Sequence, residues 1–328
     1  MNIDPLVNKI EHTVAAHRLA AGQYARWLWQ NASGSRDLGA NEYGCADAAN
    51  ILYTIGHFPQ DAGERRCWVQ TMQLMQGEDG LFHEPTHHEM HTTAHVIAAL
   101  ELFDAQPLNR LSAYDQFLSK EGLYAKLDSL DWLHKPWPQS HQGAGLYAAM
   151  VITRSVDLQW QNWYFDYLRE HCDLHTGMSR AGSMDGAPLY EHLCGWFHYL
   201  FNHVYAKRPF PYPERLIDSC IRMYDEKQLG PRFGEMVGFK EIDWVFSLNR
   251  AIRQTVYRSE EARERLAGFG DRFTAYLNGL DAEHDDELND LHMLFGAVCA
   301  LAELQQALPG RYVTTVPQKI VLDRRPFI

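Results

Sequence analysis

The amino-acid sequence predicts an all-α protein, an (α/α)6 barrel in which six outer helices surround six inner helices. Three observations lead to this prediction. Alternating strand patterns are few, two kinds of helical segment follow one another along the chain, and polar residues recur about every fifty residues. A period of that length is typical of repeat architectures, in which each repeat is one supersecondary unit.

The predicted inner helices are rich in small and apolar residues on every side. A helix that is hydrophobic all round is normally buried inside a larger assembly. They cover residues 46–56, 92–103, 143–153, 193–205, 242–252 and 291–304.

The predicted outer helices are amphipathic and alternate with the inner ones. An open solenoid of the HEAT type would instead place amphipathic helices in both positions of each pair, so we favour the closed barrel. The outer helices cover residues 8–29, 64–75, 112–127, 158–171, 213–227 and 259–277.

The repeat is most regular at the polar residues that begin the inner helices. Successive members lie 48, 50, 51, 51 and 47 residues apart, and they are Tyr43, His91, His141, His192, Asp243 and Asp290. Because no linker or shift in composition interrupts this series, we expect one domain over residues 1–328. Residues from about 312 to 328 look like an extended tail packed on the surface.

Composition excludes several classes of partner. Hydrophobic residues make up 46% of the chain and charged residues 22%, as in ordinary globular proteins. The net charge of −12 argues against a nucleic acid or an anionic membrane as partner. The chain shows no secretory signal and no apolar run long enough to span a membrane, which predicts a soluble cytoplasmic protein. Six scattered cysteines predict free thiols, and a homo-oligomer is left open.

Two segments resemble known families. "RRCWVQTMQLMQGEDGLF" (65–82) resembles the Gln/Trp-type repeat of terpenoid cyclases and protein prenyltransferases. "DLHTGMSR" (173–180) is similar to the Asp-x-x-Thr-Gly turn of six-hairpin glycosidases. Both resemblances imply the helical hairpin of an α-α toroid, and neither carries catalytic residues with it.

In such a barrel the loops that lead into the inner helices line one end of a central cavity. Inner helices two to four would supply a histidine wall, and helices five, six and one an acidic wall facing it. Aromatic rings with carboxylates suit a carbohydrate, so we expect a small-molecule or oligosaccharide substrate. The predicted substrate-binding residues are Glu42, Tyr43, Trp137, Gln139, Arg180, Tyr190, Trp196, Trp244 and His292.

Glycoside hydrolysis is the preferred chemistry, and it needs one protonated and one ionised carboxyl group. The candidate acids are Asp47, Glu241, Asp243 and Asp290, although each could instead only cap or begin a helix.

Proton transfer by histidine, as in a sugar epimerase or a polysaccharide lyase, is the first alternative, with His91, His141 and His192 as bases. The chain resembles the N-acylglucosamine 2-epimerase family in fold class and in having histidines at the cavity, but no motif of that family matches residue by residue. For His198 and His203, which lie deeper in an aromatic helix, we expect ordinary core histidines.

No metal or other cofactor is favoured. His87, His91 and His95 are spaced for one helical face and are weak zinc candidates, but "HHEMH" is not HExxH. A terpenoid cyclase or prenyltransferase-like toroid is a further alternative. The segment "EHDDELND" (283–290) does not match the Asp-x-Asp-Asp motif of such cyclases. Neither the zinc ligands of prenyltransferases nor the Cys/Cys/His set of lanthionine synthetases is recognisable. A non-catalytic binding toroid is the last alternative.

Overall fold

The computed structural model describes residues 1–179 and 186–328, and this part of the chain is mostly helical. The only strands in it, β1 (Arg18–Ala20) and β2 (Gln23–Tyr24), form one small antiparallel sheet. No helix in these ranges combines the length and the apolar character that a membrane crossing requires.

Six helices occupy the middle of the molecule, and they correspond to the six apolar segments of the sequence. They are α2 (Glu42–Thr54), α4 (Glu89–Leu102), α6 (Pro136–Ile152), α8 (Leu189–Tyr205), α10 (Phe239–Ile252) and α12 (Leu291–Ala307). Each contacts the next in this order, and α12 contacts α2. Most of their residues are buried, which confirms the prediction of helices covered on every side.

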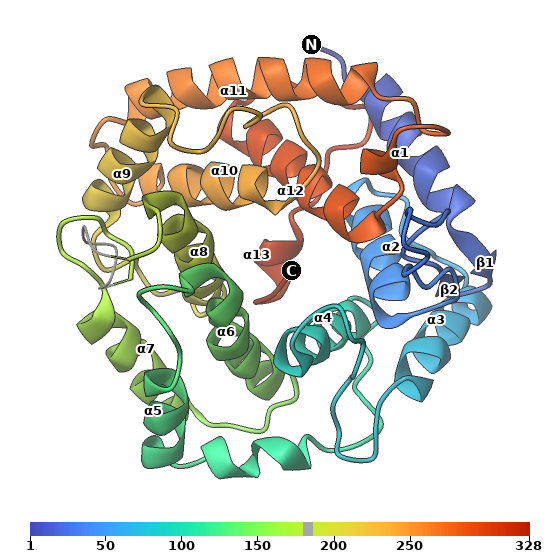
Figure 1. Cartoon of the computed structure of the whole chain (residues 1–328), viewed down its shortest axis with the longest axis horizontal. Coiled ribbons are helices and arrows are strands. Elements are labelled where there is room, and N and C mark those ends of the chain that lie inside the picture. Colours follow the sequence, from blue (N-terminus) through green and yellow to red (C-terminus); the bar gives the residue numbers. More distant parts are fainter. Residues whose placement is uncertain (180–185) are drawn as a thin grey trace.

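Six further helices lie outside these in Figure 1 and alternate with them along the chain. They are α1 (Asp4–Ala16), α3 (Ala62–Leu74), α5 (Lys120–Asp128), α7 (Leu158–His171), α9 (Pro213–Asp225) and α11 (Ser259–Gly279). Their buried residues fall on one face only, so that Trp68 and Met72 are the two buried residues of α3. Two short 3-10 helices, η1 (Ser112–Phe117) and η2 (Asp286–Leu288), lie in the connections.

Two of the predicted outer helices are wrong in extent. The helix expected over 8–29 ends at Ala16, because the chain then turns into the β1–β2 hairpin. Gly22 in that turn has a φ of +71°, and a Cβ there would lie 2.5 Å from the backbone nitrogen of Trp68. A residue with a side chain is therefore disfavoured on both counts. The helix expected over 112–127 is split into η1 and α5, because Ser119 caps α5 by accepting from Gly122 N.

The prediction of a surface tail over residues 312–328 is wrong for its last part, although Val313 and Val316 are exposed and residues 313–319 are not helical. The last residues form the short helix α13 (Val321–Arg324) and lie at the centre of the molecule in Figure 1. Phe327 and Ile328 are completely buried or nearly so. Their apolar side chains gain more from the space between the helices than from an exposed strand.

All six cysteines are free thiols, as the sequence predicted.

Candidate active site

A cavity of about 390 Å³ lies where the six central helices begin. Most of its lining comes from the first turns of α4, α6, α10 and α12 or from the segments just before the central helices. The lining residues are Arg26, His87, His91, Trp137, His141, His198, Met236, Phe239, Lys240, His292, Met293 and Ile328. Five histidines share this space, and none of these lining residues is an aspartate or a glutamate.

Three histidines, His87, His91 and His95, lie on one face of the chain at the start of α4. His88 is the N-cap of α4 and its ring accepts from Met90 N, so it has a structural role. His87, His91 and His95 are four residues apart, and their rings stack in succession with centroids 4.8 and 6.0 Å apart. His87 lies before the first turn of α4, yet its ring still lines the cavity.

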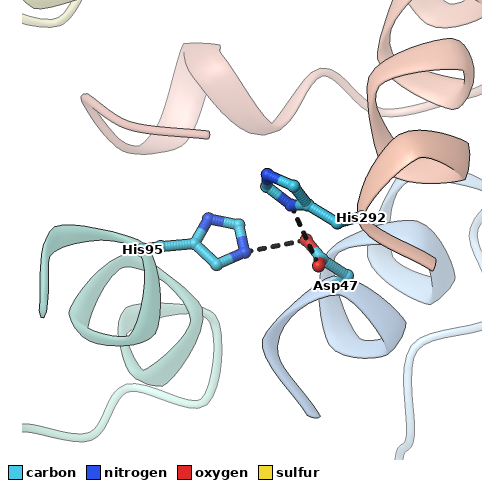
Figure 2. A group of neighbouring side chains, drawn as sticks. All are labelled: Asp47, His95 and His292. Atoms are coloured by element: carbon cyan, nitrogen blue, oxygen red, sulfur yellow. Dashed lines mark hydrogen bonds and ion pairs between the residues drawn. The ribbon is translucent and has the colours of Figure 1, made fainter. Parts of the chain in front are cut away.

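Asp47 of α2 lies beneath the cavity between two histidines from other helices (Figure 2). Its Oδ1 is 2.7 Å from Nε2 of His95, and its Oδ2 is 3.1 Å from Nδ1 of His292. Burial acts to raise the pKa of Asp47, but the rings of His95 and His292 hold it well below its usual value. The carboxylate is therefore ionised and accepts a hydrogen bond from each ring.

Tyr43 lies among these histidines, and its hydroxyl contacts His91. Its Oη is 2.6 Å from Nδ1 of His91 and 3.1 Å from Oγ1 of Thr92. Burial raises the pKa of Tyr43 well above 10, so the phenol keeps its proton. Its ring also stacks on His95 and meets His292 edge-on. Tyr43 thus contacts two histidines that line the cavity, His91 and His292. It also contacts His95, which with His292 and Asp47 forms the Asp47 cluster.

The positive charges at the cavity differ in how they are paired. Arg26 makes two hydrogen bonds of 2.8 and 2.9 Å to the carboxylate of Asp290 and a third to Thr86. Among the described residues, Lys240 donates to Leu229 O, at 3.3 Å, and its ammonium group lies 4.2 Å from the ring centre of Tyr190. Arg26 is therefore paired with Asp290, whereas Lys240 makes no ion pair within the described part of the chain.

Burial keeps most of the cavity histidines neutral at pH 7. Burial, helped by the charge of His292, lowers the pKa of His87 to about 2. Burial and neighbouring histidines lower the pKa of His91 and of His141 well below 6.5. Burial lowers the pKa of His198 to about 4. Neutral imidazoles can both donate and accept a proton, as acid–base chemistry requires.

Asp47, His95 and His292 are also the one group of described residues that could hold a metal ion. One ligand atom from each lies within 4.8 Å of the others, and two histidines with a carboxylate suit iron, manganese or zinc. The distances of 2.7 and 3.1 Å, however, fit N–H···O hydrogen bonds. The charge of Asp47 also already attracts two guanidinium groups, those of Arg26 and Arg325. A divalent ion would add positive charge to a carboxylate that these groups already balance.

The predicted site residues fall into three groups. His91, Trp137, His141 and His292 line the cavity. Tyr43 and Asp47 support two of those histidines from below, and Asp290 holds Arg26. The third group consists of predicted site residues that do not line the cavity, and they are described next.

The predicted acids of α10 belong to this third group. Burial raises the pKa of Glu241 to about 7, and its Oε1 accepts from Gly234 N in the loop before the helix. Burial raises the pKa of Asp243 well above its usual value, and its carboxyl group lies beside the thiol of Cys194. Neither residue is among those that line the cavity.

Two predicted aromatic residues and one histidine are buried in the surrounding helices. The indole of Trp244 donates to Cys220 O and stacks on Tyr224, both in α9, so it points away from the cavity. Trp196 is buried against Tyr199. His192 lies 3.2 Å from the hydroxyl of Ser179.

The other predicted binding residues lie near the rim. Glu42 is half-buried, Gln139 accepts from Gln142 Nε2, and Tyr190 lies under the Lys240 ammonium group. Arg180 lies outside the described residues.

Sequence reasoning did not find several lining residues. His198, from the middle of α8, lines the cavity although we expected a core histidine. Arg26 falls in a segment that was expected to be helical, and Ile328 in the segment that was expected on the surface. Lys240 could have been found from the sequence, because it is a cation directly before the predicted site residue Glu241.

A scan against protein-family models found no match to this chain, and searches of curated proteins and of solved structures found none either.

Proposed function

We propose that this protein is an enzyme that moves a proton on a carbohydrate or a related polar small molecule, with His292 as base and His91 as acid. The observation that carries the proposal is the contact of Asp47 with His292, a residue that lines the cavity. A buried carboxylate that orients an imidazole is the arrangement by which enzymes prepare a histidine base.

The hydrogen bonds give the two histidines opposite roles. Asp47 accepts from Nδ1 of His292, so Nε2 of that ring carries the lone pair. We assign the Tyr43 hydroxyl as the donor to Nδ1 of His91, which places the proton of that ring on Nε2. The two ring centres are 5.9 Å apart and the rings are perpendicular. One ring therefore takes a proton while the other gives one within the same cavity.

The chemistry that follows is proton removal next to a carbonyl or carboxyl group. His292 takes the proton from carbon, and the electron pair of the C–H bond moves into an enolate. His91, whose ring takes up a proton from water once the negative charge of the enolate lies beside it, then either returns a proton to carbon, which is epimerisation, or protonates a departing oxygen, which is elimination. His292 finally releases its proton to water. The ammonium group of Lys240 supplies positive charge for the enolate oxygen, and Trp137 and Phe239 supply faces for a sugar ring.

The proposal includes the architecture. Six central helices that contact one another in a closed order, with six helices outside them, support an (α/α)6 toroid around this cavity. The resemblance to six-hairpin glycosidases and to terpenoid cyclases agrees with that fold and does not select a reaction.

Glycoside hydrolysis is the second candidate. Burial raises the pKa of Glu241 to about 7, which suits a general acid. The hydrolase would need a second carboxyl group across the bond, and the acids nearest the cavity are bound to His95, His292 and Arg26. The histidine pair therefore agrees better with the cavity.

The experiment is hydrogen exchange at carbon. Reducing sugars and uronates are incubated with the protein in D2O, and loss of the proton signal next to the carbonyl group is followed by NMR. His292→Gln lowers the exchange rate by roughly 10²–10⁴-fold, the usual contribution of a positioned base. His203→Gln, at a buried histidine whose Nδ1 bonds to Tyr199 O and which does not line the cavity, is the control and keeps the rate. Equal exchange in H292Q, or release of reducing ends without exchange, would contradict the proposal.

A further inference from the structure

We infer that the cavity is a blind pocket whose floor is formed by residues 325–328, so that it accepts a small molecule or the end unit of a chain. The interior of a polymer could not pass through it. The inference deepens the proposed function, on which its statement about the substrate rests.

The first step is the path of the chain after residue 318. Lys319 N donates to Thr54 O at the end of α2, and α13 contacts both α2 and α8. Figure 1 shows α13 and the residues after it between the central helices. This segment therefore lies across the space that those helices surround.

Side chains hold the segment from several central helices at once. Arg250 of α10 bonds to Asp323 at 2.6 Å, and Glu101 of α4 accepts from Arg324 at 2.9 Å. Arg325 is completely buried and its guanidinium group donates to Asn50 of α2 and to Phe327 O. Breaking these bonds would leave buried donors and acceptors without partners, so the contacts hold the segment in place.

Asn202 of α8 completes the set of anchors by donating from Nδ2 to Pro326 O at 2.9 Å. The anchors on α2, α4, α8 and α10 lie in the second halves of those helices. The segment therefore closes the end opposite to the helix starts.

The last side chains of the segment face the cavity. The ring of Phe327 meets His91 edge-on with centroids 5.1 Å apart, and it meets Phe201 in the same way at 5.6 Å. Ile328 is itself a lining residue. The remaining lining comes mostly from helix starts and from loops before them, such as His87, Trp137 and Met236. Access is therefore from that one end.

The test measures access and does not depend on a substrate. The variant I328C places a thiol at the floor, and M236C places one at the rim, where Met236 is half-buried. In the double variant the rim thiol is first coupled to a polyethylene glycol maleimide that is too large to enter the cavity. Iodoacetamide labelling of the I328C thiol is then followed by mass spectrometry. The native cysteines are buried except Cys67, which is half-buried, and unmodified protein gives their background.

A blind pocket predicts that iodoacetamide labels I328C before the rim is blocked and that this labelling is lost afterwards. The single variant I328C, which has no rim thiol, is the control, and iodoacetamide labels it equally before and after the maleimide treatment. Unchanged labelling of I328C after blocking would show a second opening, and no labelling before blocking would show a closed cavity. Either result overturns the inference, whatever the exchange experiment on sugars shows.

Discussion

Nδ1 of His292 lies 3.1 Å from Oδ2 of Asp47, so a buried carboxylate determines which nitrogen of that histidine remains for the cavity. The same carboxylate accepts from His95 at 2.7 Å. One residue of α2 thus orients rings from α4 and α12, helices that lie far apart in the sequence and on either side of it.

Asp47→Asn is expected to disturb the tautomer of His292. An amide presents one N–H and one C=O, so it cannot accept from both rings as the carboxylate does. Nitrogen-15 NMR of histidine-labelled protein should show Nδ1–H on His292 in the native chain and a mixture in the variant. Asp79→Asn, at an exposed carboxylate that bonds to His83, is the control. An unchanged His292 tautomer in D47N would contradict the role given to Asp47.

Chelation distinguishes proton transfer from metal chemistry. If Asp47, His95 and His292 act through hydrogen bonds, dialysis against EDTA leaves the exchange rate on sugars unchanged. Added zinc should not raise it, because the guanidinium groups of Arg26 and Arg325 already lie near the carboxylate of Asp47. Loss of exchange on chelation with recovery on adding metal would assign the cluster to a metal ion instead.

The stability of the protein should fall between pH 4.5 and 7 because of Glu241. Burial raises the pKa of this carboxyl group to about 7, so the folded state binds a proton that the unfolded state has released. The free energy of unfolding has fallen by the full amount above the folded pKa, by roughly 3 kcal/mol for a single isolated group. Glu241→Gln removes this pH dependence. Urea unfolding at pH 5 and pH 8 measures the effect, and equal pH dependence in wild type and E241Q would refute it.

A second pH effect should act in the acid range through His203. Burial lowers its pKa to about 4, so the unfolded state binds a proton between pH 6.5 and 4 that the folded state does not. The free energy of unfolding therefore keeps its full value above pH 6.5. It falls as the pH drops toward 4, by roughly 3 kcal/mol for this group. His203→Gln should flatten that part of the profile. The check is the thermal midpoint at pH 7 and pH 5, where a slope like that of the wild type would count against the prediction.

The sequence predicted the central helices well and the site only in part. Segments such as 143–153 are apolar on every side, and burial in a helical assembly is the one way to satisfy that pattern. Their first polar residues then had to meet, which brought His91, His141 and His292 together. The pairing of Asp47 with two histidines could not be predicted, because it depends on how α2 is rotated between its neighbours.

The positions of the two predicted acids of α10 could not be predicted for the same reason. Glu241 and Asp243 begin a central helix, as the cavity histidines do, but they turn toward the preceding loop and toward α8. The rotation of α10 about its own axis determines where these two side chains point, and the sequence does not indicate that rotation. The prediction for the last residues was wrong because charged residues such as Arg325 suggest a surface, whereas its buried guanidinium group donates to Asn50 and to Phe327 O.

The position of Arg325 also bears on how the molecule assembles. Its contact with Asn50 joins residues 275 positions apart, and the neighbouring residues bind helices from three other parts of the chain. Their docking site does not exist until α2, α4, α8 and α10 have come together. Such distant contacts are slow to form. We therefore expect a late folding phase in which an already helical, partly open intermediate waits for residues 320–328 to close its centre.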